Sequence, residues 1–387
     1  MKLTITALAL ALAAPLAHAQ TTQGVTRNEI VIGTIQDFSG PVAAWGRQTR
    51  QGMQLRVDEL NEQGGIHGRR LRLILEDSGY DPRRATLAAQ KLVNQDRIFA
   101  MVGHIGTAQN LAAMPVQFER NVFNFFPITA ARQMFEPFHR LKYAFAATNF
   151  DQMRIAVPML YRQRNATRPC IIYQDDEFGL EVLRGAEAGL QTIGVSLVER
   201  TSFKRGATDF SSQVARMRAA NCDFVVLGTI IRETIGTIAE SRRTGFNPTF
   251  LGSSASYTDL IHRLGGRAMD GLVSAMTVAH PYLDDASPQI RFWANRYRTR
   301  FNTDPTVFSV YGYIAIDSFI RAASAAGPNL TTDSFIRAMD TMVIPPDIFG
   351  SSEMRFTPTQ RLGSNAIRLS EIREGRWHVI SDYLNTR

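Results

Sequence analysis

The stretch of residues 29–82 constrains the fold more than any other part of the chain. It opens with an apolar run at 29–36 that ends in a polar loop, continues through a long amphipathic segment at 45–60, and closes with a second apolar run at 71–75. Strand, helix and strand, with polar residues after both strands, predict a parallel α/β unit. Sheets of this kind bind ligands beyond the carboxyl ends of their strands.

The N-terminus has the pattern of a secretory signal. Lys2 precedes a nearly continuous apolar run at 3–16, and Ala17-His18-Ala19 is an A-x-A cleavage pattern. We therefore expect a signal peptide over residues 1–19 and an exported mature protein that begins near Gln20. The alternative is a membrane anchor, which is disfavoured because the apolar run is shorter than the ~18 residues that a spanning helix needs.

The composition is that of a globular protein with a moderate positive charge. Hydrophobic residues make up 44% and charged residues 20% of 387 residues, which is typical of about two domains. The formal net charge of +8 suggests an anionic partner at first sight, but the arginines are scattered along the chain. Export also argues against nucleic acid, so we interpret the charge as a solubilising surface with some bias toward anions.

Two cysteines lie where a disulfide can persist, given the expected export. Cys170 opens one predicted strand, and Cys222 directly precedes another at 223–227. If those strands are neighbours, the thiols lie close together, and we put forward the hypothesis of a bridge between them. Two free, buried thiols are the alternative, and the sequence leaves both open.

Alternating strand and helix patterns occur twice along the chain. The first group continues with strand patterns at 98–107, 122–129 and 143–146. The second group has strand patterns at 170–173, 196–203, 223–227, 249–252 and 272–277. Helix patterns follow at 288–301, 305–326 and 332–339, and a hairpin pairs 366–371 with 376–381 around Glu374-Gly375. Two successive α/β units predict an α/β protein of two doubly wound parallel-sheet domains.

The motifs of common enzyme classes are missing from the sequence. No dinucleotide-binding, P-loop, nucleophile-elbow or zinc-protease signature occurs, so we expect no enzyme, cofactor or metal site. Gly64-Gly65 fits a helix stop with His67 in the following turn. His104 lies at a strand end, where it contacts either ligand or loop backbone. The acidic run at 175–177 fits a helix N-cap better than a catalytic or metal-binding cluster.

An anion site is better supported by the residues. Thr107 and the free N–H group of Ala108 open a helix after a strand, an arrangement that receives a carboxylate without a metal. Thr129 offers a second hydroxyl at the end of the adjacent strand. The alternative, that both threonines are only helix or turn caps, is equally compatible with the sequence.

Several segments of the chain resemble a known protein family. They are the opening unit, the turn at 102–104 with Thr107, and the segments 171–179 and 206–223. Together they resemble the periplasmic solute-binding proteins of the leucine/isoleucine/valine type, which serve ABC importers, over essentially the whole mature chain. The resemblance implies two lobes joined by a multi-strand hinge, with a ligand cleft between them and crossovers near Thr148, Thr277 and Met354. Lobe 1 would hold residues 20–147 and 278–354, and lobe 2 residues 148–277 and 355–387.

The same resemblance implies a site and a partner. Trp45 would wall the pocket, and Phe178 would close over the ligand from the second lobe. The ligand carboxylate would be held by Thr107, Ile128, Thr129 and Ala130. The implied location is the periplasm, and the implied partner is the membrane permease of an ABC transporter.

The sequence departs from amino-acid binders of this type at the end that would hold an ammonium group. Ser254 stands in the place of their acidic residue, and Ile230 lies within a segment, 228–231, that lacks their usual aromatic. Burying an unpaired ammonium costs several kcal/mol. We therefore expect a carboxylate ligand without an α-amine, such as an aromatic acid or a 2-oxo acid, between apolar walls that include Trp45, Phe178 and Ile230.

Two alternatives stay open. A branched-chain amino acid is the ligand if Asp175, Asp176 or Glu233 turns toward the ammonium position. The same lobes would also serve a ligand sensor that reports to a membrane receptor instead of an importer.

Overall fold

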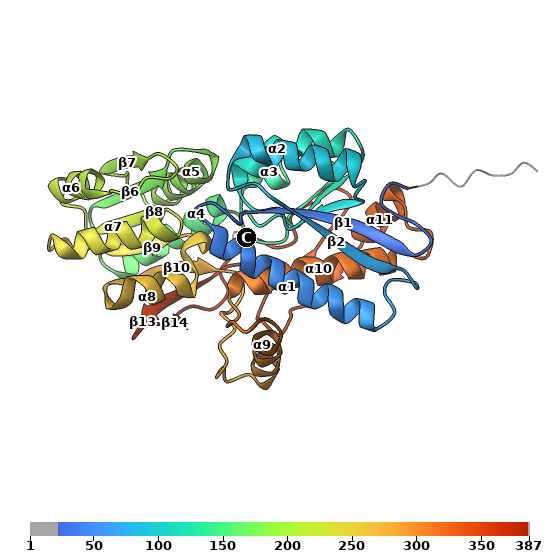
Figure 1. Ribbon diagram of the computed structural model, residues 1–387. Helices are drawn as coiled ribbons and strands as arrows, with labels where there is room; N and C mark the ends of the chain where they lie inside the picture. The colour runs from blue at the N-terminus through green and yellow to red at the C-terminus, as the bar shows by residue number, and fades with distance from the viewer. Residues whose placement is uncertain (1–21, 386–387) are drawn as a thin grey trace, which may run out of the picture.

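The computed structural model describes residues 22–385 and contains two α/β lobes side by side (Figure 1). The signal peptide expected at 1–19 lies outside these residues. The first lobe is built on a five-stranded sheet in the order β2-β1-β3-β4-β5, in which all pairs are parallel. Its strands are β1 Glu29–Gln36, β2 Arg70–Asp77, β3 Ala100–Val102, β4 Phe123–Phe125 and β5 Lys142–Tyr143.

The second lobe contains a seven-stranded sheet in the order β14-β13-β10-β9-β8-β6-β7. The strands β6 to β10 are parallel, whereas β13 and β14 add an antiparallel hairpin at one edge, which turns through Glu374 and Gly375 as predicted. The strands are β6 Pro169–Gln174, β7 Glu199–Phe203, β8 Phe224–Gly228, β9 Thr249–Gly252, β10 Val273–Met276, β13 Arg368–Arg373 and β14 Arg376–Val379. The predicted fold class, α/β with doubly wound parallel sheets, is confirmed.

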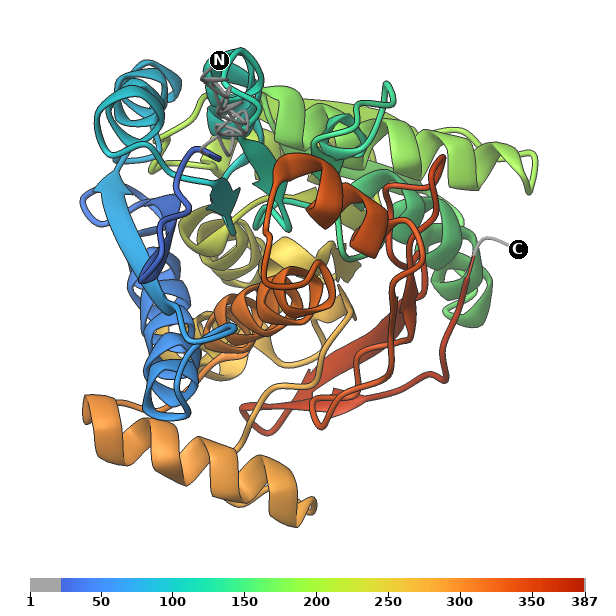
Figure 2. The same ribbon diagram turned by 90° about the vertical axis from the view of Figure 1, so that its right-hand side faces the viewer.

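Helices cover both sheets. Around the first lie α1 Ala43–Glu62, α2 Pro82–Gln90, α3 Thr107–Phe118, α10 Val307–Ala325 and α11 Thr332–Met339. Around the second lie α4 Asn149–Gln163, α5 Glu177–Gln191, α6 Ser211–Ala219, α7 Ile231–Arg243 and α8 Asp259–Gly265. The helix α9 Pro288–Phe301 projects from the body of the protein at the lower edge of Figure 2. No helix of residues 22–385 is long and apolar enough to cross a bilayer.

The contact between α1 and α10 joins the beginning of the chain to its C-terminal part. A Cβ atom on Gly52 would lie 1.9 Å from the carbonyl oxygen of Ser309, and one on Gly312 would lie 2.2 Å from that of Thr49. Both positions therefore require glycine for the helices to approach this closely. This packing returns the chain to the first lobe after β10, before β13 and β14 complete the second sheet.

The chain passes between the lobes three times. The first passage follows β5, and the second lies between β10 and α10. The third precedes β13 and follows a small ribbon made of β11 Val343–Ile344 and β12 Met354–Arg355. We retain the lobe boundaries given above as a prediction.

Two features were absent from the sequence prediction. The helix α4 follows Thr148, whose hydroxyl accepts a hydrogen bond from the Asp151 N–H at 3.0 Å, and it contains Pro158. An internal proline is unfavourable in a helix, so the sequence pattern does not predict this one. The ribbon of β11 and β12 has two residues in each strand, which is too short for a periodic pattern.

The hypothesis of a disulfide is confirmed by the structure. Cys170 and Cys222 are bonded, with Cα atoms 5.9 Å apart, and both side chains are buried. The bond ties the beginning of β6 to the segment that precedes β8, and these two strands are neighbours in the sheet.

We expect the double variant Cys170→Ala/Cys222→Ala to lose on the order of 2–4 kcal/mol of unfolding free energy, because the bond closes a long loop in the unfolded chain. Urea unfolding of both proteins, with and without reductant, measures this difference. Reductant should destabilise only the wild-type protein. Equal stability of the oxidised and reduced wild-type protein would contradict the expectation.

Candidate ligand-binding site

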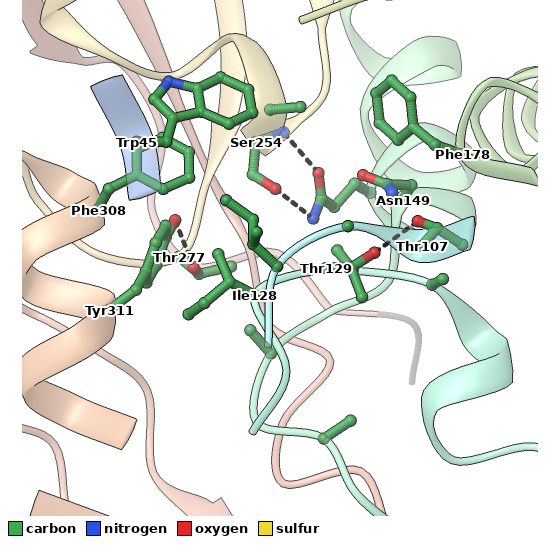
Figure 3. A pocket seen from close by; sticks show the side chains of 18 of the residues that line it. Trp45, Thr107, Ile128, Thr129, Asn149, Phe178, Ser254, Thr277, Phe308 and Tyr311 are labelled. Carbon is green, nitrogen blue, oxygen red and sulfur yellow. Dashed lines mark hydrogen bonds between the residues drawn. The ribbon is translucent and has the colours of Figure 1, made fainter. Parts of the chain in front are cut away.

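A cavity lies between the two lobes, with about 780 Å³ of space between atoms when its open mouth is included. It is lined by segments that follow the carboxyl ends of parallel strands in both sheets, as the opening α/β unit predicted. Helix α10 and Trp45 of α1 add a further wall (Figure 3).

The structure brings most of the predicted site residues together around this cavity. The residues Trp45, Thr107, Ile128, Thr129, Ala130, Phe178, Ile230 and Ser254 line it. Ala108 does not line the cavity; it is half-buried in the first turn of α3. Its predicted role therefore depends on its backbone N–H alone.

A pair of hydroxyl groups marks one end of the cavity. The Oγ1 atoms of Thr107 and Thr129 lie 2.6 Å apart, so one hydroxyl donates to the other and the second proton stays available to a ligand. Thr107 was expected to be the N-cap of its helix, but Gly106, with φ 93°, has this position and Thr107 is the first helical residue. Because Thr107 is not the cap, its hydroxyl is free to turn toward Thr129, beside the unpaired N–H groups of the first helical turn.

Buried polar groups hold this loop in place. The Asn110 side chain donates to the carbonyl oxygens of His104 at 2.8 Å and Gly106 at 2.7 Å, and the Ile128 N–H donates to the His104 carbonyl at 2.9 Å. The His104 ring does not line the cavity, and neither ring nitrogen has a partner among the described residues. Burial lowers the pKa of His104 to about 3, so the ring is neutral. The ring therefore fills neither of the two predicted roles, contact with the ligand or a bond to the loop backbone, and only the carbonyl oxygen of His104 contributes to the site.

The position expected to hold an ammonium group is closed by an amide. The Ser254 N–H donates to Gln152 Oε1 at 2.8 Å, and Gln152 Nε2 donates to the Ser254 hydroxyl at 3.0 Å (Figure 3). Gln152 also donates to the carbonyl oxygen of Ala147 at 2.8 Å, and its side chain is fully buried. Gln152 and Asn149, which also lines the cavity, both lie on α4, the helix that the sequence pattern does not predict.

The acidic residues nearby are directed elsewhere. Asp176 is the N-cap of α5, as predicted, and its carboxylate also pairs with Arg205 at 2.8 Å, while Asp175 pairs with Lys204. Glu233 is fully buried, neither of its carboxylate oxygens has a partner among residues 22–385, and burial raises its pKa to about 6. None of the residues that line the cavity is Asp, Glu, Lys or Arg. Within residues 22–385 no His, Cys, Asp and Glu side chains form a group suited to a metal ion.

The apolar wall comes largely from α10. Phe308 stacks on Trp45 with ring centroids 4.3 Å apart and planes 10° from parallel. The Tyr311 ring lies edge-on to that of Phe308, with the centroids 5.7 Å apart. The Tyr311 hydroxyl is hydrogen-bonded to that of Thr277, which follows β10. Phe178 lies on the other side of the cavity in Figure 3. No local pattern predicts Phe308 and Tyr311 as site residues, because apolar residues at helical spacing indicate a core face as readily as a pocket.

Contacts across the mouth join the lobes. The Arg132 guanidinium lies 3.0 Å from the carboxylate of Glu181, a side chain that is 1% exposed. The same guanidinium lies 3.9 Å from the centroid of the Phe150 ring. The Arg205 guanidinium lies 5.5 Å from the Tyr80 ring centroid, and Tyr80 lines the cavity. These charged groups have partners outside the cavity, and no charged side chain lines it.

A family model described as periplasmic binding protein matches residues 29–376. The chain belongs to this family. The protein is thus a binding protein and not an enzyme, and the resemblance to the leucine/isoleucine/valine type is confirmed.

Relatives of this binding protein differ in the ligands that their names give. A leucine-specific-binding protein of Salmonella typhimurium is 24% identical over 84% of this chain and 87% of its own. A fatty acid ABC transporter substrate-binding protein from Thermomonospora curvata superposes with a TM-score of 0.86, at 21% identity over 95% of both chains. A solute binding protein from R. palustris in complex with benzoate has a TM-score of 0.78, at 16% identity over 91% of this chain and 96% of that one.

The buried Glu233 generates a pH-dependent prediction. Because burial raises its pKa to about 6, the folded protein keeps a proton that the unfolded chain loses near its ordinary pKa of 4.5. The free energy of unfolding should therefore fall by about 2 kcal/mol between pH 4.5 and 7 through this group. Glu233→Gln should lack this fall, as urea unfolding at both pH values would show. Parallel pH dependence of the two proteins would contradict the assignment.

Proposed function

We propose that this protein is the extracytoplasmic solute-binding component of an ABC importer and that it binds a small carboxylate without an α-amine, an aromatic acid or a 2-oxo acid. The observation that carries the proposal is the lining of the cavity. It offers hydroxyl and N–H donors at one end and no charged side chain anywhere. We further propose that residues 1–19 are removed on export to the periplasm and that a membrane permease receives the loaded protein.

A carboxylate suits this lining because its oxygens only accept hydrogen bonds. The free hydroxyl proton of the Thr107–Thr129 pair and the first-turn N–H groups of α3 all donate. Donors at a helix N-terminus stabilise an anion even where no cation is present. One structural relative is named for a fatty acid and another is in complex with benzoate, and both compounds are carboxylic acids without an α-amine, which supports the proposal.

An α-ammonium group has no comparable partner. It requires an anion or several acceptors, and the Ser254 hydroxyl, which already accepts from Gln152, has only one further lone pair. Placing an ammonium in such a site without an anion costs several kcal/mol, and each 1.4 kcal/mol weakens the affinity tenfold.

A branched-chain amino acid is the second candidate, and one observation favours it. Glu233 has a buried carboxyl group without a partner among the described residues, three positions after the cavity residue Ile230. If its side chain turned into the cavity, it would provide the missing anion. The relative named as leucine-specific is compatible with this alternative.

Two ligands that differ only in the amine separate these candidates. Calorimetry of ligand-free protein with leucine and with its 2-oxo acid, 4-methyl-2-oxopentanoate, tests the amine, and benzoate tests the aromatic class. We expect one of the two acids to bind at least a hundredfold more tightly than leucine, since the ammonium penalty is several kcal/mol. Leucine as the tightest of the three ligands would refute the proposal.

Thr107→Val should weaken binding of the preferred acid by about ten- to a hundredfold, because a hydrogen bond to a charged group contributes about 1.5–3 kcal/mol. Thr299→Val is the matched control, since Thr299 lies exposed on α9. Calorimetry of both variants measures the effect. Equal affinities of the two variants would show that the Thr107 hydroxyl does not bind the ligand.

A further inference from the structure

The cavity has a second polar end that the proposed carboxylate does not use. Thr277 Oγ1 and Tyr311 Oη lie 3.3 Å apart, and both residues line the cavity while being largely shielded from solvent. In Figure 3 this pair and the Thr107–Thr129 pair lie on opposite sides of the pocket, with Ile128 between them. The two pairs come from different parts of the fold, since Thr277 follows β10 and Tyr311 lies on α10.

The hydroxyl protons of this pair do not balance. Thr277 and Tyr311 have one proton each, and the bond between them uses only one. Neither hydroxyl makes another hydrogen bond within residues 22–385. Burial raises the pKa of Tyr311 to about 12, so its phenol group keeps its proton at neutral pH. One donor therefore remains without an acceptor inside the cavity.

The surroundings select a flat, uncharged partner for this donor. The rings of Phe308 and Phe145 each lie with their centroids 5.7 Å from that of Tyr311, and Trp45 stacks on Phe308. Offset and edge-on contacts with these rings favour an aromatic ligand body. The hydroxyl pair offers a single spare donor, and no charged side chain lines the cavity, so this end suits a neutral oxygen atom that accepts one hydrogen bond.

We propose that Thr277 and Tyr311 form a specificity site for a neutral oxygen substituent at the end of the ligand opposite its carboxylate. The ligand class is then an aromatic acid with a distal hydroxyl or carbonyl group, of which 4-hydroxybenzoate is the simplest probe. This inference rests on the proposed function, because it requires the carboxylate to lie at Thr107 and Thr129. A plain aromatic acid leaves the spare donor unpaired in a dry site, which weakens binding.

Calorimetry with 4-hydroxybenzoate and benzoate tests the inference. The wild-type protein should bind the hydroxy acid at least tenfold more tightly, and this ratio should fall to about one in both Tyr311→Phe and Thr277→Val. Tyr313→Phe is the control, because this neighbouring tyrosine on α10 donates to Glu59 at 2.7 Å and does not line the cavity. It should keep the wild-type ratio.

Each other result has a defined meaning. Equal affinity of the wild-type protein for the two acids, with both bound, overturns the specificity site but not the proposed function. The specificity site is also overturned if both variants keep the wild-type affinity ratio, or if both acids lose affinity equally in them. The hydrogen bond between Thr277 and Tyr311 would then only hold Thr277 against α10. Binding of leucine alone overturns the proposed function and this inference together.

Discussion

The electrical neutrality of the cavity is the constraint on which the account of this protein depends. Charged side chains close to lining residues are paired with each other, as Arg132, next to Ala131, is with Glu181 and Arg205, over Tyr80, is with Asp176. Inside, polarity comes from hydroxyl groups, amides and a helix N-terminus. Such groups stabilise an anion through donated hydrogen bonds, whereas an ammonium group would lack a counter-charge. The expected class of ligand thus follows both from the absence of charged side chains in the lining and from the hydrogen-bond donors present there.

The fold builds this cavity from distant segments. Parallel strands in both sheets end at the cleft, so the loops after β3, β4, β6, β8, β9 and β10 converge there. The remaining wall depends on a long-range contact, because α10 reaches the cavity only through its close packing on α1 at Gly52 and Gly312. That packing places Phe308 on Trp45 and Tyr311 beside Thr277. Substitutions at these glycines should therefore act on the site as well as on stability.

Sequence patterns and the family resemblance predicted the elements with strong local signals. The opening α/β unit, the parallel strands of both sheets and the C-terminal hairpin follow from apolar runs bounded by turn residues, and the hairpin turn lies at Glu374 and Gly375. The resemblance led to Trp45, Thr107 and Ser254. Such patterns do not predict contacts between residues that only tertiary packing brings together. Gln152 lies on a helix with an internal proline, and the partner of the Thr107 hydroxyl proved to be Thr129 instead of its own helix.

The central claim is that the natural ligand is a carboxylate without an α-amine. Mass spectrometry of the small molecules released by denaturing the protein, purified from its own source without added ligand, tests this claim most directly. The account predicts a stoichiometric acid that contains no nitrogen, with an aromatic ring and a further oxygen if Thr277 and Tyr311 select it. A stoichiometric amino acid in the released fraction would contradict the account.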